Sequence, residues 1–186
     1  MQLRVKLAAG VAVLGIAGVS TAAIAHDRSR FETGLSGYEE LPTLSTQGVG
    51  TFQAALSRDG DELRYELSYH GPFDGNATGA ASTVLQAHIH VGARAVNGGI
   101  SAFLCTNLGN GPIGTPTCPP TEGTVTGVIT PATVVGPANQ GVAAGEFGEL
   151  VRAIRAGATY ANIHTTANTG GEIRGQISTH DEGRDH

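Results

Sequence analysis

Apolar and polar residues alternate in short segments along most of the chain, and residues that favour turns separate these segments. The clearest segment is 63–70, where Leu63, Tyr65, Leu67 and Tyr69 occupy every second position. Successive side chains of a strand point to opposite faces, so this alternation predicts a strand with one apolar face. The pattern predicts about eight strands, over residues 30–38, 48–57, 63–70, 83–91, 99–105, 123–129, 159–166 and 171–178.

The turns between the segments indicate the fold class. Residues 58–61, Arg-Asp-Gly-Asp, separate two alternating segments and predict a hairpin. Many short strands joined by such turns are typical of antiparallel sheets that fold into two layers or close on themselves. We therefore expect an all-β protein, an antiparallel Greek-key β-sandwich or barrel.

One segment has the period of a helix. Over residues 144–156 four apolar residues recur at i, i+3, i+4 and i+7: Phe147, Leu150, Val151 and Ile154. This spacing places them on one stripe of a helix. Gly157 follows and is placed to cap the end. We expect one short helix here.

The first 25 residues have the pattern of a cleavable signal peptide. Arg4 and Lys6 precede an uncharged run, 11–25, that closes on Ala23-Ile24-Ala25. The alternative is a retained membrane anchor, but the run is shorter than the roughly 20 apolar residues of a spanning helix. We expect export to a periplasm or the cell exterior, a single domain over 26–178 and a charged tail over 179–186.

Charge narrows the set of partners. The chain has 11 basic and 16 acidic residues, and loss of Arg4 and Lys6 leaves 9 and 16, a net charge of about −7 with histidine neutral. Nucleic acids and anionic membranes bind clustered positive charge. We therefore expect neither as a partner of the mature chain.

The two cysteines, Cys105 and Cys118, both lie in the exported part. An even number of cysteines in an oxidising compartment favours a disulfide, which would stabilise the fold by about 3 kcal/mol through loop closure. Two free thiols or a soft metal site are the alternatives.

Two histidines mark the most informative strand. His88 and His90 are two residues apart, so their side chains share one face, while Ala87, Ile89 and Val91 point into the core. Imidazole is a good ligand for copper, zinc and nickel. The pair is therefore half of a metal site, unless both histidines only bond to loops on a half-exposed face.

A second group lies near the C-terminus. Asn162 and His164 share one face of the strand over 159–166, and Glu172, Arg174 and Gln176 share one face of the last strand. If the sheet brings these strands together, His164 becomes a third imidazole ligand and Arg174 a nearby cation.

The motifs resemble those of the CHRD (chordin-type) domain family. The resemblance covers residues 31 to 177 and rests on four segments, Gly37-Tyr38-Glu39-Glu40-Leu41-Pro42, Ala87-His88-Ile89-His90, Gly157 to Thr165, and Gly171 to Gln176. Thr169 stands where the family usually has a proline. The resemblance implies an extracellular β-rich domain, and in chordin itself binding to signalling proteins, but it implies no reaction.

The candidate site also resembles that of copper/zinc superoxide dismutases. The matching parts are His88 and His90, the distant His164, a Cys105–Cys118 bridge and Arg174 beside the copper; a bridging histidine and an Asp-rich zinc loop are missing. This resemblance implies a mononuclear copper site, with zinc less favoured, in which Arg174 acts catalytically by orienting a small anion such as superoxide. The alternative for Arg174 is a salt bridge to Glu172 or another carboxylate.

Two more histidines are candidate ligands. His70 ends its strand on the polar face, and it either reaches the site or lies in water at the strand end. His26 would be the first residue after cleavage, where its amine and imidazole can chelate copper together, or it belongs to a disordered terminus.

Two functions follow from these patterns. The first is an exported copper-binding domain, with redox activity of the superoxide dismutase type as a further step. The second is a non-catalytic extracellular protein-binding or scaffold module. Ring nitrogens of His88, His90 and His164 that converge within about 4 Å of one point would favour metal, because imidazole ligands lie about 2 Å from the ion.

Overall fold

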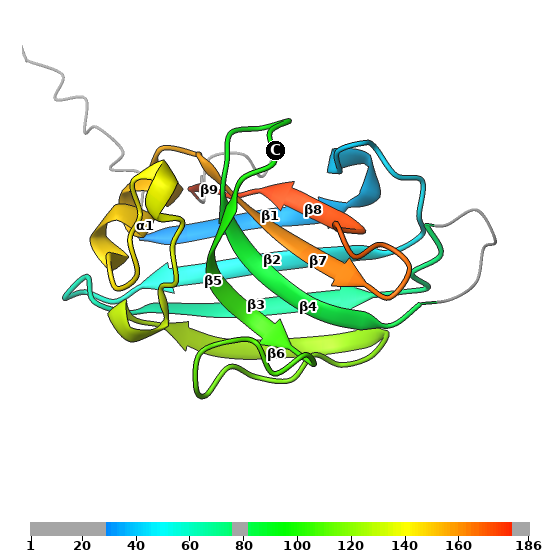
Figure 1. Ribbon diagram of the computed structural model, residues 1–186, viewed down its shortest axis with the longest axis horizontal. Coiled ribbons are helices and arrows are strands. Elements are labelled where there is room, and N and C mark those ends of the chain that lie inside the picture. Colours follow the sequence, from blue (N-terminus) through cyan, green and yellow to red (C-terminus); the bar gives the residue numbers. More distant parts are fainter. Residues whose placement is uncertain (1–28, 76–81, 180–186) are drawn as a thin grey trace, which may run out of the picture.

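The structure is a computed structural model that describes residues 29–75 and 82–179 (Figure 1). The predicted signal peptide, His26 and residues 180–186 of the predicted tail lie outside the described residues. Within the described ranges, no helix has the length and apolar character needed to cross a membrane.

Nine strands dominate the described chain, and they confirm the prediction of an all-β fold. They are β1 (Arg30–Ser36), β2 (Val49–Leu56), β3 (Leu63–His70), β4 (Val84–Val91), β5 (Gly99–Thr106), β6 (Glu122–Ile129), β7 (Thr159–Thr165), β8 (Ile173–Gln176) and β9 (Ser178–Thr179). The single strand expected over 171–178 is divided in two. The division arises because β8 pairs with both β7 and β1, whereas β9 pairs with β1 alone.

The strands form one antiparallel sheet in the order β5-β4-β7-β8-β1-β2-β3-β6, with β9 also paired to β1. The sheet curls until its edge strands, β5 and β6, approach each other, so the fold is a nearly closed barrel. Near this seam the Tyr65 hydroxyl of β3 donates a 2.6 Å hydrogen bond to the Leu104 carbonyl of β5. Gly127 of β6 makes this possible, because a Cβ there would lie 2.3 Å from the Tyr65 hydroxyl oxygen.

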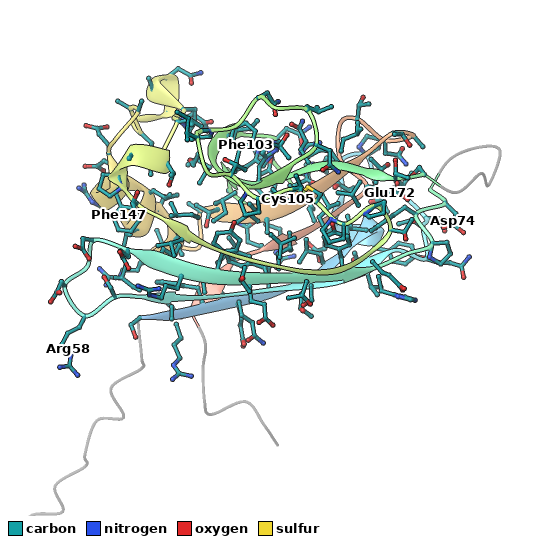
Figure 2. The ribbon with its side chains drawn as sticks, turned by 90° about the horizontal axis from the view of Figure 1, so that it is seen from below. Arg58, Asp74, Phe103, Cys105, Phe147 and Glu172 are labelled. Atoms are coloured by element: carbon teal, nitrogen blue, oxygen red, sulfur yellow. A yellow bond between two sulfur atoms is a disulfide. The ribbon has the colours of Figure 1, made fainter. Side chains whose placement is uncertain are left out.

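The helix α1 (Phe147–Arg155) lies at one end of the barrel (Figure 1). Its four stripe residues, Phe147, Leu150, Val151 and Ile154, are all buried, as their spacing predicts. The helix begins three residues later than expected, after a turn in which the carboxylate of Glu146 accepts a 2.7 Å hydrogen bond from the Ala143 amide. Figure 2 shows Phe147 at this end of the molecule and Glu172 with Asp74 at the opposite end.

The core contains the inward residues of almost every strand, with Phe31, Phe52, Leu67, Ile89, Ile163 and Ile173 fully buried. In the half of the sheet formed by β4 and β7 the other face is buried as well. All seven residues of β7 are buried, and His88 and His90 of β4 are buried together with Ala87 and Ile89. The half-exposed histidine face considered from the sequence is therefore wrong.

Candidate metal centre

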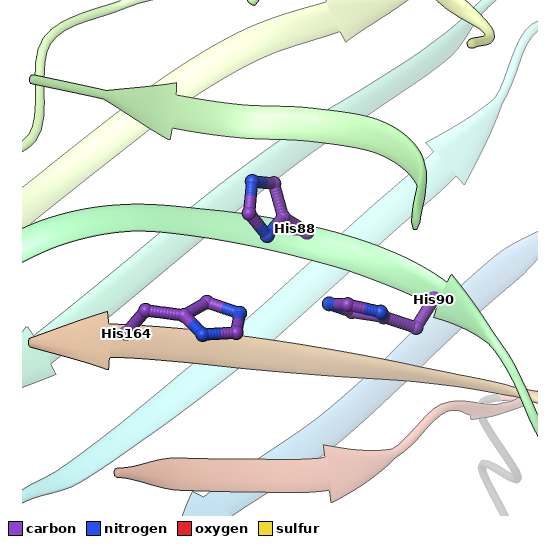
Figure 3. A group of neighbouring side chains, drawn as sticks. All are labelled: His88, His90 and His164. Carbon is purple, nitrogen blue, oxygen red and sulfur yellow. The ribbon is translucent and has the colours of Figure 1, made fainter. Parts of the chain in front are cut away.

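Three histidines lie together on the outer face of the sheet. β4 carries His88 and His90, and its neighbour β7 carries His164. In the pairing of these strands His88 lies opposite Asn162 and His90 opposite Tyr160, so His164 projects from the same face as both β4 histidines. Figure 3 shows the three rings gathered around a common point. One ring nitrogen from each lies within 4.8 Å of the other two, which meets the sequence-based criterion for a group that could hold a metal.

Backbone carbonyls fix the orientation of two of the rings. Nδ1 of His90 lies 3.0 Å from the Gly98 carbonyl oxygen, and Nδ1 of His164 lies 2.9 Å from that of Thr169. A carbonyl only accepts, so each Nδ1 carries the proton and donates it. The lone pair of each ring is then on Nε2. Such an outer hydrogen bond is what commonly orients a metal-binding histidine.

The inward nitrogens have no partner in the described part of the chain. Nε2 of His90, Nε2 of His164 and both ring nitrogens of His88 are buried without a hydrogen bond. A buried polar atom without a partner costs about 1–3 kcal/mol. Several lone pairs that face one another without a donor also repel. A cation bound by one nitrogen of each ring would remove both costs at three of these four atoms.

The histidines are neutral at ordinary pH. Burial, with the neighbouring imidazoles, lowers the pKa of His88 to about 2, and burial lowers the pKa of His90 to about 4 although the Gly98 carbonyl opposes the shift. Burial also lowers the pKa of His164. A metal binds the neutral ring, so no proton has to be displaced from these nitrogens at pH 7.

Arg174 lies beside the group and is paired with a buried carboxylate. Its Nε donates a 2.6 Å hydrogen bond to Oε2 of Glu40. Its Nη2 forms an ion pair with the same oxygen at 2.6 Å and donates a 2.8 Å hydrogen bond to Oδ1 of Asn97. Its guanidinium carbon lies 4.5 Å from the centre of the Tyr160 ring, and that ring stacks on His90. The partner of Arg174 is therefore Glu40, and the specific pairing with Glu172 considered from the sequence is wrong.

Glu172 has a different role from the one its strand position suggests. It precedes β8, and its buried carboxylate accepts hydrogen bonds from five donors, Thr46 Oγ1, the Gly75 amide, Ser82 Oγ, Thr165 Oγ1 and Asn168 Nδ2. Burial raises the pKa of this carboxyl, but the hydrogen bonds outweigh it and hold the pKa below its ordinary value. Glu172 thus joins three loops next to the turn that carries Thr169.

The remaining predicted site residues are the two cysteines and His70. Cys105 and Cys118 form the expected disulfide, and the described residues contain no free cysteine. His70 is exposed at the end of β3, where its Nδ1 lies 2.8 Å from a carboxylate oxygen of Glu122, and it is not part of the histidine group. β3 pairs with β2 and β6, whereas the group lies on β4 and β7.

Sequence reasoning missed two residues of the site. Glu40 lies in the Gly37 to Pro42 motif, but nothing in that motif indicates a buried carboxylate paired with Arg174, 134 residues away. Tyr160 was recognised only as part of a strand. Its position two residues before Asn162 on the histidine-bearing face was the available signal.

Comparison with known proteins gives one positive result. The model of a protein family described as the CHRD domain matches residues 31–177. No curated protein and no solved structure matches the chain. The additional likeness to copper/zinc superoxide dismutases receives no support from these comparisons.

Proposed function

Since the chain belongs to the CHRD domain family, we propose that its function is that of an exported CHRD domain that binds one copper ion through His88, His90 and His164. The observation that carries this proposal is the convergence of buried, unpartnered imidazole nitrogens from two neighbouring strands. Folding alone gives no reason to leave these nitrogens without donors, since buried polar groups are almost always paired.

The donor set favours copper. Imidazole binds copper, zinc, nickel and iron, and among divalent first-row ions a nitrogen site of given geometry binds copper most strongly. Hard ions such as magnesium and calcium prefer oxygen ligands, and no carboxylate belongs to the group among the described residues. Zinc is the main competitor, because three histidines are also a common zinc ligand set.

Export fits the same proposal. The disulfide between Cys105 and Cys118 is typical of proteins that leave the reducing cytosol. The n-region, apolar run and A-x-A pattern of residues 1–25 supply the signal.

The geometry supports metal holding better than superoxide turnover. In a dismutase-like reaction Arg174 would attract the anion, but its Nε and Nη2 already bond Glu40 and Asn97, and only 5% of the residue is exposed. We therefore assign copper binding as the function and give Arg174 no catalytic role.

Metal titration of the mature chain, beginning at His26, tests the proposal. We expect one copper ion per chain with a dissociation constant well below micromolar, and a loss of at least about 100-fold in His88→Ala and His164→Ala. His70→Ala is the matched control and should bind like the wild type, while a chain beginning at Asp27 shows whether the terminal amine and His26 contribute. Binding weaker than micromolar, or unchanged binding in both ligand variants, would contradict the proposal and favour the protein-binding module.

A further inference from the structure

The ligands offer no negative charge to balance a bound ion. All three are neutral imidazoles, and the described part of the chain places no carboxylate or thiolate in the group. Whatever charge the ion carries is therefore the net charge of the ligand cluster. A divalent ion leaves two uncompensated charges, and a monovalent ion leaves one.

Burial makes the difference between one and two charges large. His88 is fully buried, and His90 and His164 are each 6% exposed. The cost of moving an ion from water into a low-dielectric interior grows with the square of its charge, so a divalent ion costs about four times as much as a monovalent ion of the same size. Phe103 contacts His88 edge-on at 4.5 Å between ring centres, and Asn162, which lies opposite His88 on β7, is buried as well.

A fixed cation adds to this effect. The guanidinium of Arg174 and the imidazole of His90 contact the same Tyr160 ring, at 4.5 Å and 4.8 Å from its centre. Arg174 also lowers the pKa of His90 and His164, behind the larger effect of burial. The guanidinium is thus the part of the Glu40–Arg174 pair that contacts the ring stacked on His90.

The number of ligands also favours a monovalent ion. Divalent copper in proteins prefers a tetragonal arrangement of four or more ligands, and zinc prefers four. The described residues supply three buried nitrogens and no fourth ligand, and three such donors suit an ion with a filled d shell and low charge. Cu(I) is the monovalent copper ion with that electron count.

Resting on the proposed copper function, we infer that the site is selective for Cu(I) over divalent ions and that Arg174, as a positioning charge, strengthens this selectivity. The chemical class of the ligand is thus a cuprous ion, held by three neutral imidazoles beside a fixed cation.

Competition titrations of the mature chain measure the selectivity. Cu(I) is titrated without oxygen against a chromophoric cuprous chelator, and Zn(II) and Cu(II) are titrated against chelating dyes. We expect wild-type protein to bind Cu(I) more tightly than either divalent ion. Because Arg174 lies no more than about 9 Å from the His90 ring, removing its charge should favour a divalent ion over Cu(I) by about tenfold.

Two substitutions that change the local charge in opposite directions separate an electrostatic effect from a loss of structure. Arg174→Gln should lower the ratio of Cu(I) to Zn(II) affinity by about tenfold, and Glu40→Gln should raise it by a similar factor. Arg174→Lys, which keeps the charge, should leave the ratio unchanged. If Arg174→Gln fails to fold because Glu40 loses its partner, Glu40→Gln and Arg174→Lys still test the prediction. The exposed Arg64–Glu62 pair supplies the controls Arg64→Gln and Glu62→Gln, which should shift nothing.

The outcomes distinguish the inference from the function on which it rests. Tighter binding of Zn(II) or Cu(II) than of Cu(I) would overturn the selectivity and leave metal binding intact. A ratio that stays constant in the folded charge variants, or that moves in one direction in both Gln variants, would overturn the role of Arg174. Failure to bind any of the three ions would overturn the proposed function itself.

Discussion

The imidazole of His90 lies flat on the phenol ring of Tyr160, with ring centres 4.8 Å apart and planes only 4° apart. The two residues are also joined through Gly98, whose amide donates to the Tyr160 hydroxyl oxygen at 3.1 Å and whose carbonyl accepts from His90 Nδ1. Tyr160 thereby fixes both the plane of the His90 ring and the backbone group that sets its tautomer.

Removal of the Tyr160 hydroxyl should weaken metal binding without unfolding the protein. In Tyr160→Phe the ring stacking remains, but the Gly98 amide loses its acceptor and the carbonyl beside it becomes less fixed. Loss of an outer partner of a metal-binding histidine typically costs 10- to 100-fold in affinity, and we expect a value near the lower end. Tyr38→Phe, at an exposed tyrosine, is the control for a competition titration. Equal affinities for both variants would show that Tyr160 acts through packing alone.

Gly98 should tolerate no side chain. A Cβ at this position would lie 1.6 Å from the Val91 carbonyl oxygen, so Gly98→Ala must move the backbone that carries the acceptor of His90 Nδ1. We expect an unfolding free energy lower by at least about 2 kcal/mol together with weaker metal binding. Gly148→Ala is a matched control in α1, where a Cβ meets nothing within 4 Å, and it should stabilise the protein by about 0.5–1 kcal/mol. Chemical denaturation measures the unfolding free energy of both variants. Equal values for Gly98→Ala and Gly148→Ala would contradict the predicted clash at Gly98.

The local part of the architecture could be predicted from the sequence, and the long-range part could not. Period-two alternation in β3 and the apolar stripe of α1 depend on neighbouring residues, so both elements lie where the pattern places them. The spacing of His88 and His90 guarantees a shared face for the same reason. The approach of His164 depends on the pairing of β4 with β7, which local periodicity cannot give.

No local sequence pattern indicated that the histidine face is buried. Residues that cover or orient it come from separate loops: Gly98 before β5, Thr169 after β7 and Glu40 after the 3-10 helix η1 (Gly37–Glu39). His70 shows the same limit. Its alternation with Tyr69 correctly indicated the polar face, but only the strand order reveals that β3 belongs to another part of the barrel.

The metal-free protein should lose stability as the pH falls below about 6.5. His88 and His90 have folded-state pKa values of about 2 and about 4, below the ordinary value near 6.5, so the unfolded chain takes up protons that the folded chain excludes. Between pH 6.5 and 5 each such histidine costs up to about 1.4 kcal/mol per pH unit.

Denaturant titrations at pH 7, 6 and 5 on metal-free protein measure this effect. His88→Leu removes one of the depressed groups, so its stability should depend less steeply on pH than that of the wild type, by up to one proton. A slope unaltered by His88→Leu would show that the imidazole is not held neutral by the fold.

Glu172→Gln should destabilise the end of the barrel opposite α1. Five donors converge on this buried carboxylate, and an amide in its place puts an NH2 group against some of them. We expect an unfolding free energy lower by about 2–4 kcal/mol, since hydrogen bonds to a buried charge are worth about 1.5–3 kcal/mol each and part is retained by the amide oxygen. Glu66→Gln, at an exposed position of β3, should change stability by less than about 0.5 kcal/mol in the same denaturation experiment. A loss of unfolding free energy no larger than that of Glu66→Gln would contradict the proposal that the Glu172 carboxylate holds the three loops together.

Reduction of the Cys105–Cys118 bridge should loosen the seam of the barrel more than the metal centre. Cys105 belongs to the edge strand β5, and Cys118 precedes β6, so the bridge holds the intervening loop at the gap between the two edges. The paired residues are 13 apart in sequence, and loop closure of that size stabilises a fold by about 3 kcal/mol. Cys105→Ala/Cys118→Ala should therefore unfold at lower denaturant concentration, while metal affinity falls by less than about tenfold, because no ligand depends on the loop. Amide hydrogen exchange of β5 and β6 should rise in the variant before that of β7. Unchanged stability, or a loss of metal binding as large as that of His88→Ala, would show that the bridge supports the site rather than the seam.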